Sequence, residues 1–482
     1  MQTKFKNEFT LWISKQNHAI ELLALAQQLW FNKSLELVIF RKTIIDSSPS
    51  EILNHHLYAR QIVKNDVTVD KTLAITQEIA KLDLPPTVID IGKLTFEWEK
   101  EEAMFSSKAD FVKTKLANLV GKDKSFQKPK DVVLFGFGRV GRLAARILFA
   151  RAGRGDQLLL KAIVVRETKN PDDIIKRAEL LRADSVHGPF KGTITVDNEL
   201  KAMRVNGHIV QIIYSSTPDG IDYTTYGIKD ALLIDNTGVY RDRDGLSRHL
   251  KSTGISQVVL TAPGKGDIPN IVYGVNQTIH NPEEKIFSAA SCTTNAIAPV
   301  LKVVNDYYTI DHGHIETVHS YTNDQNLLDN YHKKYRRGRS AALNMVITET
   351  GAAKAVAKVI PDLAGKFTGN AVRVPTPNVS LAILHMRLKK ETTIEELNGI
   401  LKAESLSGSL CEQIEYAVSN ELVSSDIIGN THACVVDSAA TLIDSNKRNV
   451  VLYVWYDNEF GYTRQVVRLA GYISKNLRLT YY

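Results

Sequence analysis

Hydrophobic side chains follow a helical period through the first quarter of the chain. From residue 9 to residue 31 they recur every three or four positions, and residues 57–63 and 73–82 repeat this spacing. Of the chain's 28 glycines, only two precede Gly136. We therefore predict an all-α region over residues 1–128, with a lysine-rich connector near its end. Its amphipathic helices can form a small core of their own, and a face that binds a partner is the alternative.

The period changes at residue 132. Residues 132–135 form a short apolar run, typical of a buried strand, and Gly136, Gly138 and Gly141 follow at the spacing G-x-G-x-x-G. A helical apolar pattern begins directly after them. Because the glycines stand between a strand and a helix, the backbone can approach a pyrophosphate at the start of the helix. The pattern predicts a dinucleotide-binding domain.

Strand-like and helix-like segments then alternate, as in a parallel sheet with helices on its faces. We predict a Rossmann-type NAD(P)-binding domain over residues 129–291 and an α+β catalytic domain over residues 292–459. A final helix over residues 460–482 is expected to pack back on the dinucleotide domain. The strand-like segments that support this prediction are residues 158–165, 232–238, 257–266 and 286–289, which end in polar residues or in small residues such as glycine, and the longer strand candidates 313–320, 379–388 and 450–456.

A candidate nucleophile stands between these two domains. Cys292 is flanked by small hydroxyl residues and begins an apolar segment, and His319 follows 27 residues later. The free N–H groups at a helix N-terminus favour a thiolate, and a nearby histidine can act as a base. Taken alone, a cysteine and a histidine are more often structural, so the rest of the chain must decide.

Composition limits the class of protein. The chain has 482 residues, of which 44% are hydrophobic and 23% charged, and no run is apolar enough to cross a membrane. Three cysteines argue against a disulfide framework and for a reducing compartment, so we expect a cytoplasmic protein. The formal charge of +7 suits anionic metabolites. We expect no nucleic-acid partner, since basic runs with interleaved aromatic residues are absent, and no metal.

Two oppositely charged residues end the second strand of the dinucleotide domain. Glu167 stands where an acid usually accepts the ribose hydroxyls of NAD, whereas a guanidinium at Arg166 can meet the 2′-phosphate of NADP. Both can also be ordinary charges at an exposed strand end. We predict NAD as the cofactor, with NADP not excluded.

Several longer motifs resemble phosphorylating glyceraldehyde-3-phosphate dehydrogenase from about residue 132 to the C-terminus. They occur in the order that the family has, over some 350 residues. The matching segments are residues 136–142, 184–188, 291–295, 350–354, 373–380 and 455–462.

The resemblance implies a function and a set of site residues. Glyceraldehyde 3-phosphate is oxidised with inorganic phosphate through a thioester on Cys292, and His319 handles the proton. Thr322 and Arg373 are implied for the substrate phosphate, and a homotetramer is implied by the family alone. The second anion site is implied at Ser291, Thr293, Arg337, Thr350 and Gly351, and the cofactor site at Gly136, Phe137, Gly138, Arg139, Val140, Glu167, Thr261 and Asn458.

The chain departs from the family pattern at several positions. Phe135 and the pair Arg166-Glu167 replace residues on the adenosine side, as does the pair Asn330-Tyr331. Asp324 stands where many members carry a phosphate-binding threonine, and Ala296 replaces a second cysteine. Two alternatives therefore stay open, namely an erythrose-4-phosphate dehydrogenase and a non-catalytic dinucleotide-binding regulatory protein.

Overall fold

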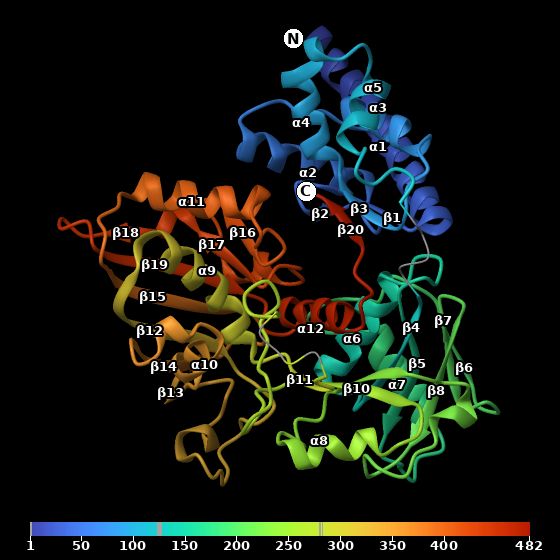
Figure 1. The fold of residues 1–482 in the computed structure, drawn as a ribbon, viewed down its shortest axis with the longest axis vertical. Coiled ribbons are helices and arrows are strands. Elements are labelled where there is room, and N and C mark those ends of the chain that lie inside the picture. The colour runs from blue at the N-terminus through green and yellow to red at the C-terminus, as the bar shows by residue number, and fades with distance from the viewer. Residues whose placement is uncertain (1, 123–127, 279–280, 282) are drawn as a thin grey trace. The chain divides into compact units, whose positions relative to one another are not determined.

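The computed structural model describes residues 2–122, 128–278, 281 and 283–482, and these divide into two compact units. The first unit contains residues 1–129, 152–157 and 475–482, and the second contains residues 130–151 and 158–474 (Figure 1). Most of the predicted lysine-rich connector lies outside the described residues.

The first unit is built on a sheet, which corrects the prediction of an all-α region. Its strand order is β2-β1-β3-β20, with β1, β3 and β20 parallel and β2 antiparallel to β1. The strands are β1 (Leu35–Ile39), β2 (Lys42–Thr43), β3 (Thr87–Asp90) and β20 (Leu479–Tyr481). The apolar runs at β1 and β3 are only five and four residues long, too short for a period to separate them from buried helix.

Helices surround this sheet, and three of them include the segments whose helical spacing was predicted. The longest begins the chain, and its first turns expose Phe5, Phe9 and Trp12 to solvent. A partner for this region stays a prediction. The helices of the unit are α1 (Gln2–Lys33), α2 (Pro49–Val63), α3 (Val69–Ala80), α4 (Ile91–Glu101), the 3-10 helix η1 (Glu102–Met104) and α5 (Lys108–Lys115).

The second unit begins with the predicted Rossmann-type sheet, whose strand order is β11-β10-β9-β4-β5-β8-β7-β6. The six strands from β11 to β8 in that order are parallel to one another, and β7 pairs antiparallel with both β8 and β6. The strands are β4 (Lys130–Phe135), β5 (Leu158–Val165), β6 (Ile194–Asp197), β7 (Ala202–Val205), β8 (His208–Tyr214), β9 (Ala231–Asp235), β10 (Ile255–Leu260) and β11 (Ile286–Ser288). The helices are α6 (Arg139–Ala150), α7 (Asp173–Arg182), α8 (Arg243–Leu250) and the 3-10 helix η3 (Tyr223–Tyr226).

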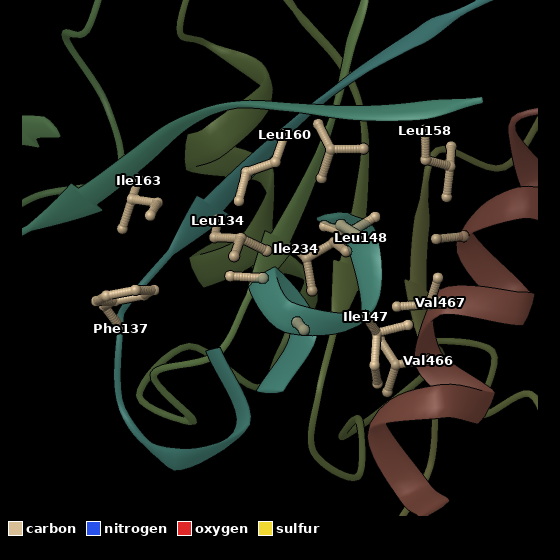
Figure 2. Close-up of a cluster of buried hydrophobic side chains, with 14 of the residues drawn as sticks. Leu134, Phe137, Ile147, Leu148, Leu158, Leu160, Ile163, Ile234, Val466 and Val467 are labelled. Carbon is tan, nitrogen blue, oxygen red and sulfur yellow. The ribbon is translucent and has the colours of Figure 1, made fainter. Parts of the chain in front are cut away.

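A buried apolar cluster joins this sheet to α6 and to α12 (Phe460–Ile473). Figure 2 shows Leu134 and Ile234 of the sheet, Ile147 and Leu148 of α6, and Val466 of α12 in this cluster. Burial of such side chains contributes about 1.5–3 kcal/mol each. The cluster therefore fixes the start of α6, and with it the glycine loop, against the sheet.

The catalytic half of the second unit carries another eight-stranded sheet, ordered β13-β14-β12-β15-β19-β17-β16, with β18 paired to β19. The strands are β12 (Ile310–Ser320), β13 (Val346–Glu349), β14 (Phe367–Val374), β15 (Ser380–Leu388), β16 (Ile414–Ala417), β17 (Cys434–Asp437), β18 (Leu442–Ile443) and β19 (Asn449–Tyr456). The helices are α9 (Cys292–Tyr308), α10 (Ala352–Val359), α11 (Ile394–Ser407) and the 3-10 helices η4 (Tyr335–Gly338), η5 (Pro361–Leu363), η6 (Ser424–Ile427) and η7 (Ser438–Ala440).

The C-terminal segment corrects a second prediction. The helix expected over residues 460–482 ends at Ile473, and residues 475–482 belong to the first unit, where β20 pairs with β3. The loop at residues 152–157 also belongs to that unit rather than to the dinucleotide domain. Both short segments are too polar or too short to reveal such long-range pairing.

Within the described residues, no helix combines the length and the apolar character needed to span a membrane. The same part of the chain holds no cluster of three or more histidine, cysteine or acidic side chains suited to a metal ion.

Candidate active site

Cys292 is the first residue of α9, at the point where the two apolar cores of the second unit meet. Ser291 caps this helix, because its hydroxyl accepts a hydrogen bond from the Thr294 N–H at 3.1 Å. The preceding Ala290 has a φ of 54°, a left-handed conformation that is uncommon outside glycine. The chain therefore turns sharply at Ala290, just before α9 begins at Cys292.

His319 faces this cysteine from β12. Its Nε2 lies 3.7 Å from the Cys292 sulfur, and its Nδ1 lies 2.8 Å from the Ser320 carbonyl oxygen and 2.7 Å from Nη1 of Arg373. Strands β12 and β14 are parallel and place His319 directly beside Arg373. In the tautomer whose Nδ1–H donates to the Ser320 carbonyl, Nε2 is the nitrogen available to the sulfur, and Arg373 donates to the same carbonyl.

Burial controls the protonation of this pair. Burial raises the pKa of the Cys292 thiol, although the Arg373 charge and the hydrogen bonds at the helix start act in the opposite direction. Burial and the same arginine lower the pKa of His319 to about 3. The thiolate expected from the helix N-terminus is thus outweighed by desolvation. In the free protein the imidazole of His319 is therefore neutral, and its Nε2 can accept the proton of the Cys292 thiol.

Replacing Arg373 by glutamine should shift the pH profile of Cys292 alkylation upward by about one pH unit. The guanidinium stabilises the thiolate, so its loss raises the thiol pKa further and makes alkylation need a higher pH. The rate with iodoacetamide between pH 6 and pH 10, followed by mass spectrometry, measures this shift. Arg339→Gln, at an exposed ion pair with Asp329, is the control. An unchanged or lower midpoint in R373Q would contradict the assigned electrostatics.

The residues implied for the substrate phosphate lie near this pair. Arg373 donates to the Ser320 carbonyl through Nη1 at 2.8 Å, while its buried Nε has no hydrogen-bond partner among the described residues. An unsatisfied buried donor on a cation is a suitable place for an anion. The Thr322 hydroxyl instead donates to Asp324, whose carboxylate also pairs with Arg337. Asp324 thus contacts Thr322 and Arg337, two side chains that the resemblance implies for binding phosphate.

The contacts in the structure connect only some of the residues predicted for the second anion site. Arg337 of η4 donates through Nε to Thr348 at 3.1 Å, and its charge acts on both Arg373 and His319. The Thr293 hydroxyl lies 3.0 Å from the hydroxyl of Tyr456. Thr350 accepts from the Ala352 N–H, and Gly351 caps α10. No hydrogen bond described in the structure joins Ser291, Thr293, Thr350 and Gly351 to Arg337, so their shared role stays a prediction.

The glycine loop fits the pyrophosphate of a dinucleotide. Gly136 has a φ of 95°, and a Cβ on Gly141 would lie 2.4 Å from the Gly136 carbonyl oxygen, so both positions need glycine. A Cβ on Gly138 would meet nothing within 4 Å, which leaves open space at the start of α6. Backbone N–H groups can therefore approach a phosphate there.

The other predicted cofactor residues differ in what their side chains can contribute. Phe137 is buried in the core, Arg139 is ion-paired with Asp184 and Glu459, and Val140 follows in the first turn of α6. Only the backbone of these three is available to a phosphate. Thr261 donates its hydroxyl to the Asp235 carbonyl at 3.0 Å, and Glu167 is exposed at the end of β5.

Asn458 is held from the catalytic sheet. Its side-chain oxygen accepts hydrogen bonds from Ser320 at 2.9 Å and from Ser380 at 3.0 Å. Both hydroxyls therefore fix the amide with its nitrogen directed elsewhere, as is needed to donate to a nicotinamide amide. Ser320 and Ser380 were not predicted from the sequence, because a serine in a strand carries no signal of this kind.

An ion cluster explains the motif at residues 184–188, to which the sequence assigned no role, and links it to the motif that contains Asn458. His187 lies 3.2 Å from Asp457 through Nε2, and Asp184 accepts hydrogen bonds from the Val186 and His187 N–H groups. Asp457 in turn accepts from the Glu459 and Phe460 N–H groups. The cluster therefore holds the turn that carries Asn458.

Comparisons with known proteins agree with this site. Residues 130–243 match the family described as "Glyceraldehyde 3-phosphate dehydrogenase, NAD binding domain", and residues 291–458 match "Glyceraldehyde 3-phosphate dehydrogenase, C-terminal domain". The chain is 42% identical to "Glyceraldehyde-3-phosphate dehydrogenase 2" of a Synechocystis species, over 72% of this chain and 98% of the relative.

A second relative shares the N-terminal region too. A "Glyceraldehyde-3-phosphate dehydrogenase-like protein" of Pseudomonas aeruginosa is 53% identical over 451 residues, which is 93% of this chain and 97% of the relative. This alignment is longer than the part of the chain that follows residue 130, so it includes much of the first unit. The chain therefore belongs to the glyceraldehyde-3-phosphate dehydrogenase family and is an NAD-dependent oxidoreductase.

Proposed function

We propose that this protein catalyses the reversible, phosphate-dependent oxidation of glyceraldehyde 3-phosphate to 1,3-bisphosphoglycerate. One observation carries the proposal. The Cys292 sulfur lies 3.7 Å from the His319 Nε2, beside Arg373, whose buried Nε has no hydrogen-bond partner among the described residues. A nucleophile, a base and an anion site thus converge at one point.

The chain's own residues divide the chemistry between them. The Cys292 sulfur forms a bond to the aldehyde carbon as its proton passes to His319 and on to the new alkoxide. His319 then accepts the hydroxyl proton of this hemithioacetal as the carbon is oxidised. A bound nicotinamide dinucleotide supplies the hydride acceptor. A phosphate oxygen finally attacks the thioester, and the carbon–sulfur bond breaks to return the thiol.

Two separate anion sites are proposed around the reacting carbon, one for each phosphate. Arg373 and Thr322 are proposed to hold the substrate phosphate, because Arg373 lies directly beside His319. Arg337, with Ser291, Thr293, Thr350 and Gly351, is proposed to hold the attacking phosphate. Guanidinium and hydroxyl groups are suited to phosphate oxygens.

The test is the initial rate of dinucleotide reduction with glyceraldehyde 3-phosphate, measured with and without inorganic phosphate. We expect sustained turnover only with phosphate, since the thioester otherwise accumulates after one turnover. Erythrose 4-phosphate is the comparison substrate. Faster turnover of erythrose 4-phosphate without phosphate would replace the proposal by the second candidate, which the occupation of Arg337 and Thr322 by Asp324 favours.

Replacing Asp324 by asparagine should lower the KM for inorganic phosphate about fivefold, which corresponds to about 1 kcal/mol. The carboxylate competes with inorganic phosphate for Arg337. Steady-state rates at varied phosphate concentration measure the change. Asp329→Asn, at the exposed pair with Arg339 in the same loop region, is the matched control. A raised KM in D324N, with no change in D329N, would show instead that Asp324 positions Arg337.

We further propose that the protein is a homotetramer. The loop between β12 and β13 exposes apolar side chains, among them Tyr331, Tyr335, Leu343 and Met345, each at least 76% exposed. Such a group is unusual on a monomer and is typical of an interface. Sedimentation at micromolar concentration tests the assembly, and a monomer would exclude it.

A further inference from the structure

The first turns of α1 project from the rest of the first unit. Residues 5–15 are all exposed, whereas Gln16 is half-buried and Ala19 is buried. At about 1.5 Å of rise per residue, the projecting part is roughly 16 Å long. A short stretch of helix without side-chain contacts gains little stability in water, so a partner along its side would stabilise it.

Aromatic side chains form one stripe along this projecting part. Phe5, Phe9 and Trp12 are 68%, 62% and 50% exposed, and the rings of Phe9 and Trp12 stack with their centroids 6.0 Å apart. Their spacing of four and three residues continues along α1 through residues 16, 19, 23, 26 and 30. The stripe is therefore the a and d seam of a heptad repeat, and only the later half of that seam is covered within its own unit.

Two opposite charges flank the stripe on the same side of the helix. Glu8 and Lys15 are exposed and seven residues apart, so both take the g position when Phe9 is at a and Trp12 is at d. In an antiparallel pair of helices, g positions face each other. If Phe9 of each copy packs on Trp12 of the other, Glu8 of each copy lies beside Lys15 of the other.

A parallel pair of the same helices offers no such match. Its g positions would face e positions, which hold Lys6, Ile13 and Ile20 in this chain. Glu8 would then face Ile13, and Lys15 would face Ile20. Charge complementarity therefore favours an antiparallel pair of identical helices, whose contacts are related by a two-fold axis.

We propose that α1 is a self-association surface, at which two copies of this chain pair through antiparallel helices. Phe9 and Trp12 form the centre of the contact, and Glu8 of each copy forms an ion pair with Lys15 of the other. The proposal does not depend on the reaction that the second unit catalyses, nor on the surface through which the catalytic halves meet.

The contact covers a limited length of α1. It ends near Gln16, whose amide donates to the Ser50 hydroxyl of α2 at 3.3 Å within its own unit. A seam of about three turns covers less than the roughly 800 Å² per partner of a standard interface. The helix pair is therefore weak by itself and adds to other contacts between copies.

Charge reversal tests the pairing in the full-length chain by sedimentation equilibrium. Glu8→Lys and Lys15→Glu should each weaken self-association about tenfold, because each variant turns two attractive pairs into two repulsive ones. The double variant Glu8→Lys with Lys15→Glu should return to within about threefold of the wild type, since opposite charges meet again. An equal mixture of the two single variants should do the same. A double variant as weak as either single variant would overturn the proposal.

The aromatic seam has a matched control on the same helix. Phe9→Ala should weaken self-association about tenfold or more. Leu11→Ala removes a side chain that is 50% exposed on the opposite side of α1, and it should leave self-association unchanged. Circular dichroism checks that both variants keep the helix. Equal effects of the two variants would contradict a contact through the seam.

Cross-linking locates the contact whatever the size of the assembly. Isotopically light and heavy chains are mixed and treated with a carbodiimide, which joins a carboxylate directly to a lysine amine. Peptides that join Glu8 of one isotope to Lys15 of the other are expected in the wild type and should be lost in Phe9→Ala. Their absence would overturn the proposal. Binding to vesicles of phosphatidylcholine and phosphatidylglycerol that requires Phe9 would then assign the stripe to an anionic membrane surface instead.

Discussion

A chain in which Cys292 is replaced by alanine is expected to lose the proposed phosphate-dependent dehydrogenase activity by about 10⁴-fold or more. In the proposed mechanism the sulfur holds the acyl group between oxidation and attack by phosphate, so its loss removes this covalent route. Binding of the dinucleotide should persist, because the glycine loop is fixed by the core around α6 and not by the cysteine. Initial rates and calorimetric binding measure the two properties separately.

The other two cysteines provide the matched controls. Cys411 and Cys434 are buried cysteines of the same unit, and burial raises the pKa of the Cys434 thiol. Alanine at either position removes a sulfur of the same kind without touching the reacting pair. We expect both variants to retain most of the activity. More than about 1% activity in C292A, with normal turnover in the controls, would exclude a thioester on Cys292.

The residues around the reacting pair could be predicted because their signals are local. The glycine spacing after residues 132–135 specifies a loop that only glycine permits, and the steric contact at Gly141 confirms this reason. Cys292 and His319 come together because one begins a helix and the other ends a neighbouring strand. Both positions follow from short motifs whose meaning depends on few distant contacts.

The adenosine side could not be resolved in the same way. The sequence places Arg166 and Glu167 next to each other, and only the structure shows that Arg166, and not Glu167, lines a pocket beside the glycine loop. Arg177 lies on the following helix α7, and nothing in its spacing places it at this pocket. The opposing effect of burial on the pKa of the Cys292 thiol was also not predicted, because burial is a property of the whole fold.

The first unit is the part of the fold that local sequence patterns predict least well. Strand β20 reaches β3 from the far end of the chain, so no window of sequence contains both partners. Buried parallel strands of three to five residues also lack a period that separates them from helices. Besides its pairing with β3, the late segment is held by a charged pair, which no hydrophobic pattern reveals.

That pair joins Arg478 to Glu36 of β1 at 2.7 Å, with both side chains at most 8% exposed. The guanidinium also lies 4.0 Å from the centroid of the Trp30 ring. Two charges are costly to bury, and their mutual attraction and hydrogen bonding offset this cost only while both are present. Removal of Arg478 leaves the Glu36 carboxylate buried without this ion pair.

Replacing Arg478 by alanine should therefore lower the free energy of unfolding of the first unit by about 3–5 kcal/mol. Three of the four tryptophans, Trp12, Trp30 and Trp98, belong to this unit, so tryptophan fluorescence during urea unfolding of the full chain reports on it. Arg60→Ala, which breaks the exposed pair with Asp66 in the same unit, should cost at most about 1 kcal/mol. The double variant Glu36→Leu with Arg478→Met should recover most of the loss, because no charge is then left unpaired. Equal small losses in R478A and R60A would mean that the C-terminal strand is held by its backbone pairing alone.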